Sequence, residues 1–372
     1  LKDGYGRECT GDNSALLKTF PKIKFNSYDK SISFLISHIK KNKSLINFKA
    51  LKDDKFLNYA KKINWIILNN MNYNFETVLK EDSERILKLR IPWYKIKNKK
   101  ILITGGNSFI VSYFIKILFL INIVKKLNIT IDCTTRDKKK TKNLYDKRYT
   151  KKFLTIHKIS LLKKITLKNK YNYIIHAASL SSPKFFRDNP IDVVLPNILG
   201  TINLLKFSEK KKIDKFIYFS STGVNGFVDD KARPISENIY GSLDPTLISN
   251  SYLESKRMGE NLCYAWYSQK NIPIQIVRPS ITYGPGIQLD DGRSYADFIS
   301  NIVQNKNLIL SSKGTAIRNY CYISDFIGGL ILMMTKWKVG ETFNIANEQE
   351  ISIKNLANLI VNKFFKEKKL KV

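Results

Sequence analysis

The sequence predicts an α/β protein built on a parallel β-sheet with helices on both faces. Between residues 100 and 278, short apolar runs typical of buried strands alternate with helical segments. A glycine-containing turn separates the first of these runs from a long apolar helix. The strands are expected at 101–103, 129–133, 173–176, 216–219 and 274–277, and the helices at 109–127, 193–208 and 252–268.

Changes in composition and in the spacing of apolar residues divide the 372 residues into four predicted regions. They are an N-terminal segment (1–45), a helical leader (46–97), the sheet-forming domain (98–278) and a smaller C-terminal region (279–372). A helix at 74–90 ends the leader, because Pro92 disfavours helical backbone at the residue before it. The C-terminal region loosens into loops and finishes in an amphipathic helix at 353–365.

The formal net charge is +33, from 64 Lys and Arg against 31 Asp and Glu. Only eleven of these cations are Arg, and the Lys residues are spread along the whole chain. A nucleic-acid-binding protein gathers its cations on one face and favours Arg, so we expect no nucleic-acid partner. Strongly salt-dependent binding to duplex DNA is the test of the opposite interpretation. The aromatic content of 12% excludes a wholly disordered chain.

We expect no metal site, no membrane span and a cytoplasmic location. The three histidines have no ligand spacing, and the cysteines form no CxxC pair; these are Cys9, Cys133, Cys263 and Cys321. No signal peptide is recognised at the start of the sequence. The apolar run at 109–124 is shorter than the ~20 residues that span a bilayer, which favours a buried helix.

The turn after the first strand reads TGGNSFIVS (104–112). Glycines at such a turn let backbone N–H groups approach a pyrophosphate at the positive end of a helix. Ser108 and Val111 replace two of the expected glycines, so an unoccupied fold of the same kind is the alternative. The predicted cofactor contacts of this turn are Gly105, Asn107, Ser108, Phe109 and Ile110.

The second strand bears on the choice between NAD and NADP. Asp132, expected at the end of this strand, suits a ribose 2′-hydroxyl. Arg136 and the lysines at 138–140 would suit a 2′-phosphate instead. We expect NAD, with NADP left open.

A phenol and an ammonium lie four residues apart at Tyr252 and Lys256, which places them on one helix face. A neighbouring ammonium lowers the pKa of a phenol and makes it a usable proton acceptor. The strand at 216–219 ends in Ser220, Ser221 and Thr222, at the sheet edge where open α/β sheets bind ligands. The sequence therefore predicts a Ser–Tyr–Lys catalytic set.

Eight short motifs occur in order between residues 100 and 350. They are TGGNSFIVS (104–112), HAAS (176–179), Asn197 with Gly200-Thr201, SST (220–222), YLESK (252–256), RPS…YGPG (278–286), RNYCYISD (318–325) and NIAN (344–347). Together they resemble an extended short-chain dehydrogenase/reductase of the NAD-dependent nucleotide-sugar epimerase/dehydratase family. The segment 290–298, with Pro92-Trp93, resembles the UDP-glucuronate decarboxylases of this family.

This resemblance implies a Rossmann-type doubly wound parallel sheet with a C-terminal substrate-binding region and a helical N-terminal extension. Tyr252 would take the proton from a sugar 4-hydroxyl while hydride passes to the nicotinamide. Lys256 would bind the nicotinamide ribose, and Ser221 would hydrogen-bond the reacting oxygen. A UDP-linked sugar substrate and a homodimer are implied in the same way.

The resemblance also implies further contacts. Those to the cofactor are Ala177, Ala178, Ser179, Asn197, Ser220 and Pro279, besides Tyr252 and Lys256. Those to the substrate are Ser182, Thr222, Arg293 and Arg318. The two arginines are candidates for the diphosphate, since a guanidinium fork suits two oxygens, although each could also be an ordinary surface cation.

The chain departs from the family pattern after the serine. Gly223 stands where a Glu is expected, and Asn225 replaces a Tyr. Removal of water from a sugar needs an acid and a base here, so dehydration is disfavoured. Epimerisation and decarboxylation at a 4-keto sugar both remain open, as does a degenerate protein that binds without catalysis.

The ends depart as well. Family members usually continue beyond the helix at 353–365, so we expect a truncated substrate-binding region. Residues 1–45 resemble the tail of a related enzyme, with a plain helical extension as the alternative.

Overall fold

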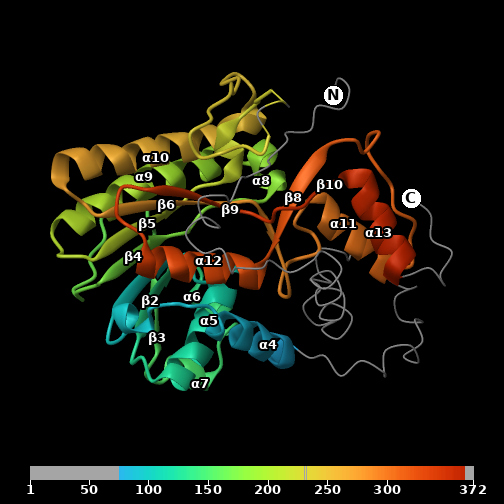
Figure 1. Cartoon of the computed structure of the whole chain (residues 1–372). Coiled ribbons are helices and arrows are strands. Elements are labelled where there is room, and N and C mark those ends of the chain that lie inside the picture. Colours follow the sequence, from blue (N-terminus) through green and yellow to red (C-terminus); the bar gives the residue numbers. More distant parts are fainter. Residues whose placement is uncertain (1–74, 230, 232, 365–372) are drawn as a thin grey trace.

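The computed structural model describes residues 75–229, 231 and 233–364 (Figure 1). The predicted N-terminal segment 1–45 therefore lies outside the described residues, as does most of the leader. Helix α4 (Phe75–Leu87) confirms the helix predicted at 74–90. It is followed by the short helix η3 (Trp93–Ile96), just after Pro92.

Within the described residues, seven strands form one sheet in the order β3-β2-β1-β4-β5-β6-β9. They are β1 (Lys100–Thr104), β2 (Thr130–Thr135), β3 (Leu154–Lys158), β4 (Tyr173–His176), β5 (Lys215–Phe219), β6 (Ile274–Pro279) and β9 (Thr342–Ile345). Every neighbouring pair is parallel. The strand order reverses between β1 and β4, so their carboxyl ends flank the crevice where doubly wound sheets bind ligands. This confirms the predicted fold class.

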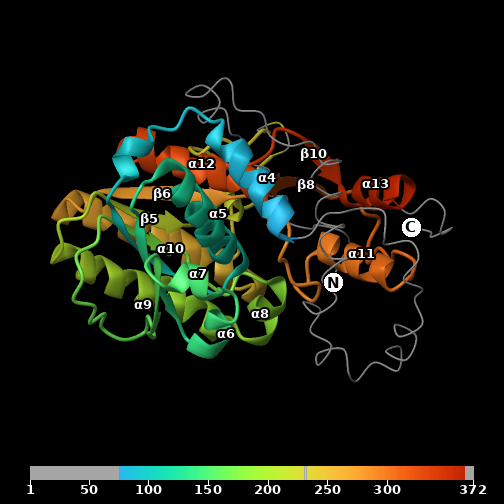
Figure 2. The same cartoon turned by 90° about the horizontal axis from the view of Figure 1, so that it is seen from below.

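Helices cover both faces of this sheet, as the two views in Figures 1 and 2 show. On one face lie α9 (Pro190–Glu209) and α10 (Ser251–Lys270); on the other lie α5 (Phe109–Lys125) and α12 (Ile323–Lys336), with α4 packed against both. The strand residues alternate between the two layers. Ile101 and Ile103 belong to the core beneath α5 and α12, whereas Leu102 belongs to the core beneath α9 and α10.

Shorter elements connect these layers. They are α6 (Lys138–Lys142), α7 (Lys147–Thr150), α8 (Pro183–Asp188), η4 (Thr222–Asn225) and η6 (Ile248–Asn250). The strand β3 was not predicted, because only Leu154 and Ile156 of its residues are apolar.

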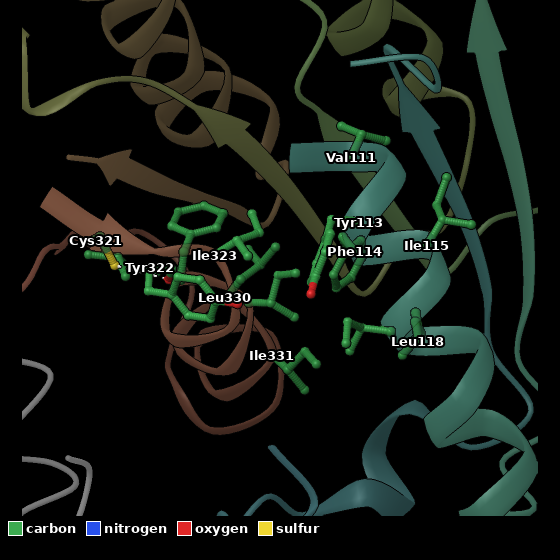
Figure 3. Packing of buried hydrophobic residues seen from close by; sticks show 14 of the residues in the cluster. Val111, Tyr113, Phe114, Ile115, Leu118, Cys321, Tyr322, Ile323, Leu330 and Ile331 are labelled. Carbon is green, nitrogen blue, oxygen red and sulfur yellow. Dashed lines mark hydrogen bonds between the residues drawn. The ribbon is translucent and has the colours of Figure 1, made fainter. Parts of the chain in front are cut away.

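Helix α5 is the buried helix that the sequence predicted at 109–127. Its Phe114 and Leu118 belong to the same buried apolar cluster as α12 residues such as Ile331 (Figure 3). Among the described residues, only α9 is long and apolar enough to cross a membrane by length and composition. Its Leu204 and Leu205 are buried against the sheet, and its neighbour is α10.

A second sheet of three strands lies in the C-terminal part of the described chain, in the order β10-β8-β7. Its strands are β7 (Ile281–Tyr283), β8 (Ile317–Tyr322) and β10 (Glu350–Ser352), and its helices are α11 (Ser294–Val303) and α13 (Ile353–Phe364). The boundary predicted at residue 279 does not separate the two sheets in sequence. Strand β9 pairs with β6 of the large sheet, and α12 covers that sheet.

Candidate functional site

The turn between β1 and α5 is held in one conformation. Gly105 has a φ of +82°, and a Cβ on it would lie 3.0 Å from Cα of Ala178. Only glycine meets both conditions without strain. The N–H groups of Gly105 and Gly106 donate to the carbonyl of Thr134 at 3.1 and 3.0 Å. The predicted contacts Asn107 to Ile110 follow as half-buried residues at the start of α5.

Thr104, which the sequence analysis did not single out, fixes the other side of the crevice. Its Oγ1 accepts hydrogen bonds from the N–H groups of Ala177 and Ala178 at 3.0 and 2.9 Å. The same oxygen lies 3.0 Å from Nδ1 of His176, and burial lowers the pKa of His176 to about 3. His176 is therefore neutral, and Thr104 donates its proton to Nδ1. This places the predicted residues Ala177 and Ala178 directly beside the glycine turn.

The expected position of Asp132 is wrong. Asp132 is the third residue of β2, not its end, and its side chain is 1% exposed. Four neighbours enclose the carboxylate: His157 at 3.1 Å, Asn169 at 2.8 Å, Tyr171 at 2.7 Å and Lys100 at 3.1 Å. Burial alone would raise the pKa of Asp132, but the hydrogen bonds from Tyr171 and Asn169 and the charge of Lys100 hold it below its usual value. A carboxylate partnered in this way is not available to a ribose hydroxyl.

Arg136 is exposed and directly follows β2. It is thus at the sheet edge where Asp132 was expected.

Lys256 is anchored beneath the predicted catalytic phenol. Its Nζ donates to the carbonyl of Phe219 at 2.6 Å, and burial lowers its pKa to about 7. The same nitrogen lies 4.9 Å from the ring centre of Tyr218 and 5.9 Å from that of Tyr252. Tyr252 itself is 8% exposed, in the first turn of α10. The helical spacing therefore brings phenol and ammonium together as predicted.

The serines after β5 lie at the same edge, because η4 packs against α10. Ser221 accepts a hydrogen bond from the N–H of Gly223 at 3.2 Å, which leaves its own proton free to be donated. Thr222 is buried, and its hydroxyl donates to the carbonyl of Pro279 at 3.4 Å. The ends of β5 and β6 are thus joined behind Ser221.

Asn197, predicted as a cofactor contact, supports the first turn of α10. Its Nδ2 donates to Oγ of Ser255 at 2.9 Å, and Ser255 donates to the carbonyl of Tyr252 at 2.8 Å. A chain of two hydrogen bonds thus connects α9 to the first turn of α10. Ser255 was missed in the sequence, although it lies within the YLESK motif.

The predicted substrate residues divide into two groups. Ser182 donates to the carbonyl of Asp291 at 2.5 Å, and Arg293 bonds the carboxylate of Asp291 at 2.6 Å. Arg293 also interacts electrostatically with Tyr252. Arg318 is on β8 in the second sheet, where it donates to the carbonyl of its neighbour Ile317 at 2.7 Å.

A dinucleotide fits this edge of the sheet. Ser179 and Ser220 follow β4 and β5, and each has a buried hydroxyl without a partner among the described residues. A polar ligand in the crevice supplies such partners. Within the same residues, no group of three or more His, Cys, Asp or Glu side chains converges as metal ligands do.

The solved structures with this fold include an epimerase from Methanothermobacter thermautotrophicus, with 19% identity and a TM-score of 0.64, covering 80% of this chain and 82% of that one. A UDP-glucuronic acid 4-epimerase from Bacillus cereus, in complex with NAD, has 24% identity and a TM-score of 0.60, covering 73% and 86%. At these identities the likeness supports the fold alone.

UDP-glucuronic acid decarboxylase 6 of Arabidopsis thaliana is 30% identical over 266 residues, which are 71% of this chain and 74% of that relative. Several other UDP-glucuronic acid decarboxylases match over 187 residues, about half of their length or less. Residues 101–346 match the profile of the NAD dependent epimerase/dehydratase family. Since this match covers more than half of the chain, the chain belongs to the NAD-dependent epimerase/dehydratase family of enzymes, and this confirms the prediction of NAD as its cofactor.

Proposed function

We propose that this enzyme transiently oxidises C4 of a UDP-linked sugar, with UDP-glucuronate as the first candidate substrate. The observation that carries the proposal is the convergence of Tyr252, Lys256 and Ser221 at one edge of the sheet. The relatives that are UDP-glucuronic acid decarboxylases support the choice of substrate.

Tyr252 takes the proton of the sugar 4-hydroxyl through its phenol oxygen. NAD held between the Gly105 turn and the Ala177–Ala178 segment would supply a reversible acceptor for the hydride of C4. When Lys256 is protonated, its positive charge lies close enough to the Tyr252 ring to favour the phenolate. The hydrogen bond to the carbonyl of Phe219 fixes the Lys256 side chain in this position. Ser221 donates its free proton to the C4 oxygen, where negative charge develops.

The 4-keto sugar has two outcomes. A C6 carboxylate is then in a β-keto acid and leaves as carbon dioxide, which is the decarboxylation that the curated relatives support. The second candidate is C4 epimerisation, and Gly223 favours it. The residue contributes only backbone beside Ser221, so no carboxylic acid at this position assists a later step.

We propose that the sugar and its diphosphate contact Ser182, Arg293 and Arg318, whereas Thr222 is buried and bonded to Pro279, so it supports Ser221 instead. The electrostatic interaction of Arg293 with Tyr252 supports a place near the sugar. Arg318, on the second sheet, is the candidate for the diphosphate.

We also propose a homodimer that pairs α9 and α10. Ile191 and Leu199 of α9 and Met258 of α10 are exposed apolar side chains on these two helices. Sedimentation of the purified protein tests this: a dimer that Met258→Glu dissociates is expected, and a monomer at all concentrations contradicts it.

The proposed function is tested with UDP-glucuronate that carries deuterium at C4, followed by proton NMR. We expect product in which the deuterium is back at C4, since the hydride goes to the cofactor and returns. A UDP-pentose with carbon dioxide identifies decarboxylation, and UDP-galacturonate identifies epimerisation. Product whose C4 has lost the deuterium, or no product from any UDP-sugar, contradicts the proposal.

A further inference from the structure

The phenyl ring of Phe186 lies flat on the ring of Tyr252. The ring centres are 4.5 Å apart and the planes are inclined by 9°. Phe186 comes from α8, whereas Tyr252 is in the first turn of α10, so the contact joins two separate elements. One face of the phenol ring is therefore covered by a side chain from outside its own helix.

Helix α8 is only six residues long, and distant residues fix its start. The hydroxyl of Ser182 donates to the carbonyl of Asp291, and Arg293 donates to the carbonyl of Ser181 at 2.8 Å. Asp291 and Arg293 pair with each other at 2.6 Å. These hydrogen bonds join residues more than one hundred positions apart in the sequence, and they fix the start of the helix that carries Phe186.

The stack adds a restraint that the helix alone does not provide. A tyrosine in the first turn of a helix can still turn about its side-chain bonds, which swings the phenol oxygen by several ångströms. Phe186 blocks that motion on the covered side, and stacked aromatic pairs favour the parallel arrangement seen here. The stack thereby limits the positions that the phenol oxygen can take.

We infer that Phe186 is a positioning residue for the proton transfer at Tyr252. The inference rests on the proposed function, because it assigns the phenol the role of the base. Loss of the ring leaves Tyr252 chemically intact but poorly oriented. Since misplacement of a reacting group by about 1 Å can cost roughly 100-fold in rate, the effect is expected in kcat rather than in KM.

The neighbour Phe185 provides a matched control. It lies on the same short helix and packs against the same apolar cluster, which contains Val193, Leu243, Tyr252 and Leu253. Within the described part of the chain, no aromatic ring stacks on Phe185. A purely structural role for aromatic residues of α8 predicts equal effects at both positions, whereas positioning of Tyr252 predicts an effect at Phe186 alone.

The experiment uses the full-length protein with four variants: Phe186→Ala, Phe186→Tyr, Phe185→Ala and Tyr252→Phe. Tyrosine labelled with ¹³C in the ring is observed by NMR, and the Tyr252 signal is the one lost in Tyr252→Phe. A ring stacked on its face shifts this signal upfield. We expect that shift in wild type, Phe186→Tyr and Phe185→Ala, and its loss in Phe186→Ala.

In parallel, kcat and KM are measured with UDP-glucuronate. For Phe186→Ala we expect kcat to fall roughly 10- to 100-fold with KM changed less than about twofold. Phe186→Tyr and Phe185→Ala should stay near the wild-type kcat. Loss of the upfield shift in Phe186→Ala without a fall in kcat overturns the inference, as does an equal fall in Phe185→Ala.

The two proposals fail in different ways. Absence of the upfield shift in the wild type overturns the stack, whatever the activity. A normal shift with no turnover of any UDP-sugar by the wild type overturns the proposed function and, with it, the catalytic role given to Phe186.

Discussion

Nζ of Lys256 donates a hydrogen bond to the carbonyl of Phe219 at 2.6 Å, and the Lys256 side chain is buried. Phe219 is the last residue of β5, and Ser220 and Ser221 follow it directly. One hydrogen bond therefore ties the helix that carries Tyr252 to the strand that presents Ser221. The three proposed catalytic groups keep their relative positions because this bond crosses from α10 to the sheet.

Replacement of Lys256 by Met is expected to abolish most of the activity. The variant loses both the charge beside Tyr252 and the tie to Phe219, so turnover should drop by at least about 100-fold. Lys270→Met, at the exposed end of the same helix, is the control and should retain the wild-type rate. The rates are compared under saturating UDP-glucuronate; equal rates for the two variants would refute the role of Lys256.

The same lysine predicts a pH dependence of stability. Its pKa is about 7 in the folded protein, below the ordinary value of 10.5, because the site is buried. Between these values the unfolded chain binds more protons, so the free energy of unfolding rises with pH. Urea unfolding of NAD-free wild type, relative to Lys256→Met, should show this rise from about pH 7 to pH 10. Parallel curves for the two proteins would count against a lowered pKa of Lys256 in the folded state.

A second titration is expected at Asp82 in α4. Its carboxylate accepts hydrogen bonds from Tyr113 at 2.6 Å and Tyr322 at 3.2 Å, and Arg85 lies nearby. Burial raises the pKa of Asp82 from 3.8 to about 6. In this range the folded state binds more protons, so wild-type stability should fall as pH rises from about 4 to 6.

Asp82→Asn removes this titration while it keeps an oxygen for the two tyrosines. The free energy of unfolding of the wild type, relative to that of Asp82→Asn, should therefore fall by about 2–3 kcal/mol as the pH rises across that interval. Thermal unfolding at several pH values measures it. A difference that stays constant would show that Asp82 has an ordinary pKa.

Thr104 is expected to matter for both stability and cofactor binding. In Thr104→Val the N–H groups of Ala177 and Ala178 lose their acceptor. An unsatisfied group of this kind costs about 1–3 kcal/mol, and the loop beside the glycine turn loosens. Thr104→Ser keeps the hydroxyl and should resemble wild type. Denaturant unfolding and NAD titration test the pair; a valine variant as stable as the serine variant would contradict this account.

Local patterns in the sequence were enough to predict most of the large sheet. Strands β1, β4 and β5 and helix α10 lie within two residues of their predicted bounds, because continuous apolar runs mark strands buried on both faces. The proximity of Tyr252 and Lys256 was also predictable from a local pattern, because residues four positions apart lie on the same face of a helix.

Features that depend on distant contacts were not predictable. Strand β9 is four residues long and belongs to the large sheet only because it pairs with β6. Asp132 was placed wrongly because a shift of two or three residues along β2 moves a side chain from the ligand edge into the core. The stack of Phe186 on Tyr252 joins residues with no sequence signal in common.

The central claim is that Tyr252 acts as the base in oxidation at C4 of a UDP-linked sugar. The most direct measurement compares wild type with Tyr252→Phe, both analysed for bound NAD and for conversion of UDP-glucuronate by proton NMR. We expect both proteins to hold NAD, and product to form with the wild type alone. NAD bound to both proteins with equal conversion, or with no conversion of any UDP-sugar by the wild type, would contradict the claim.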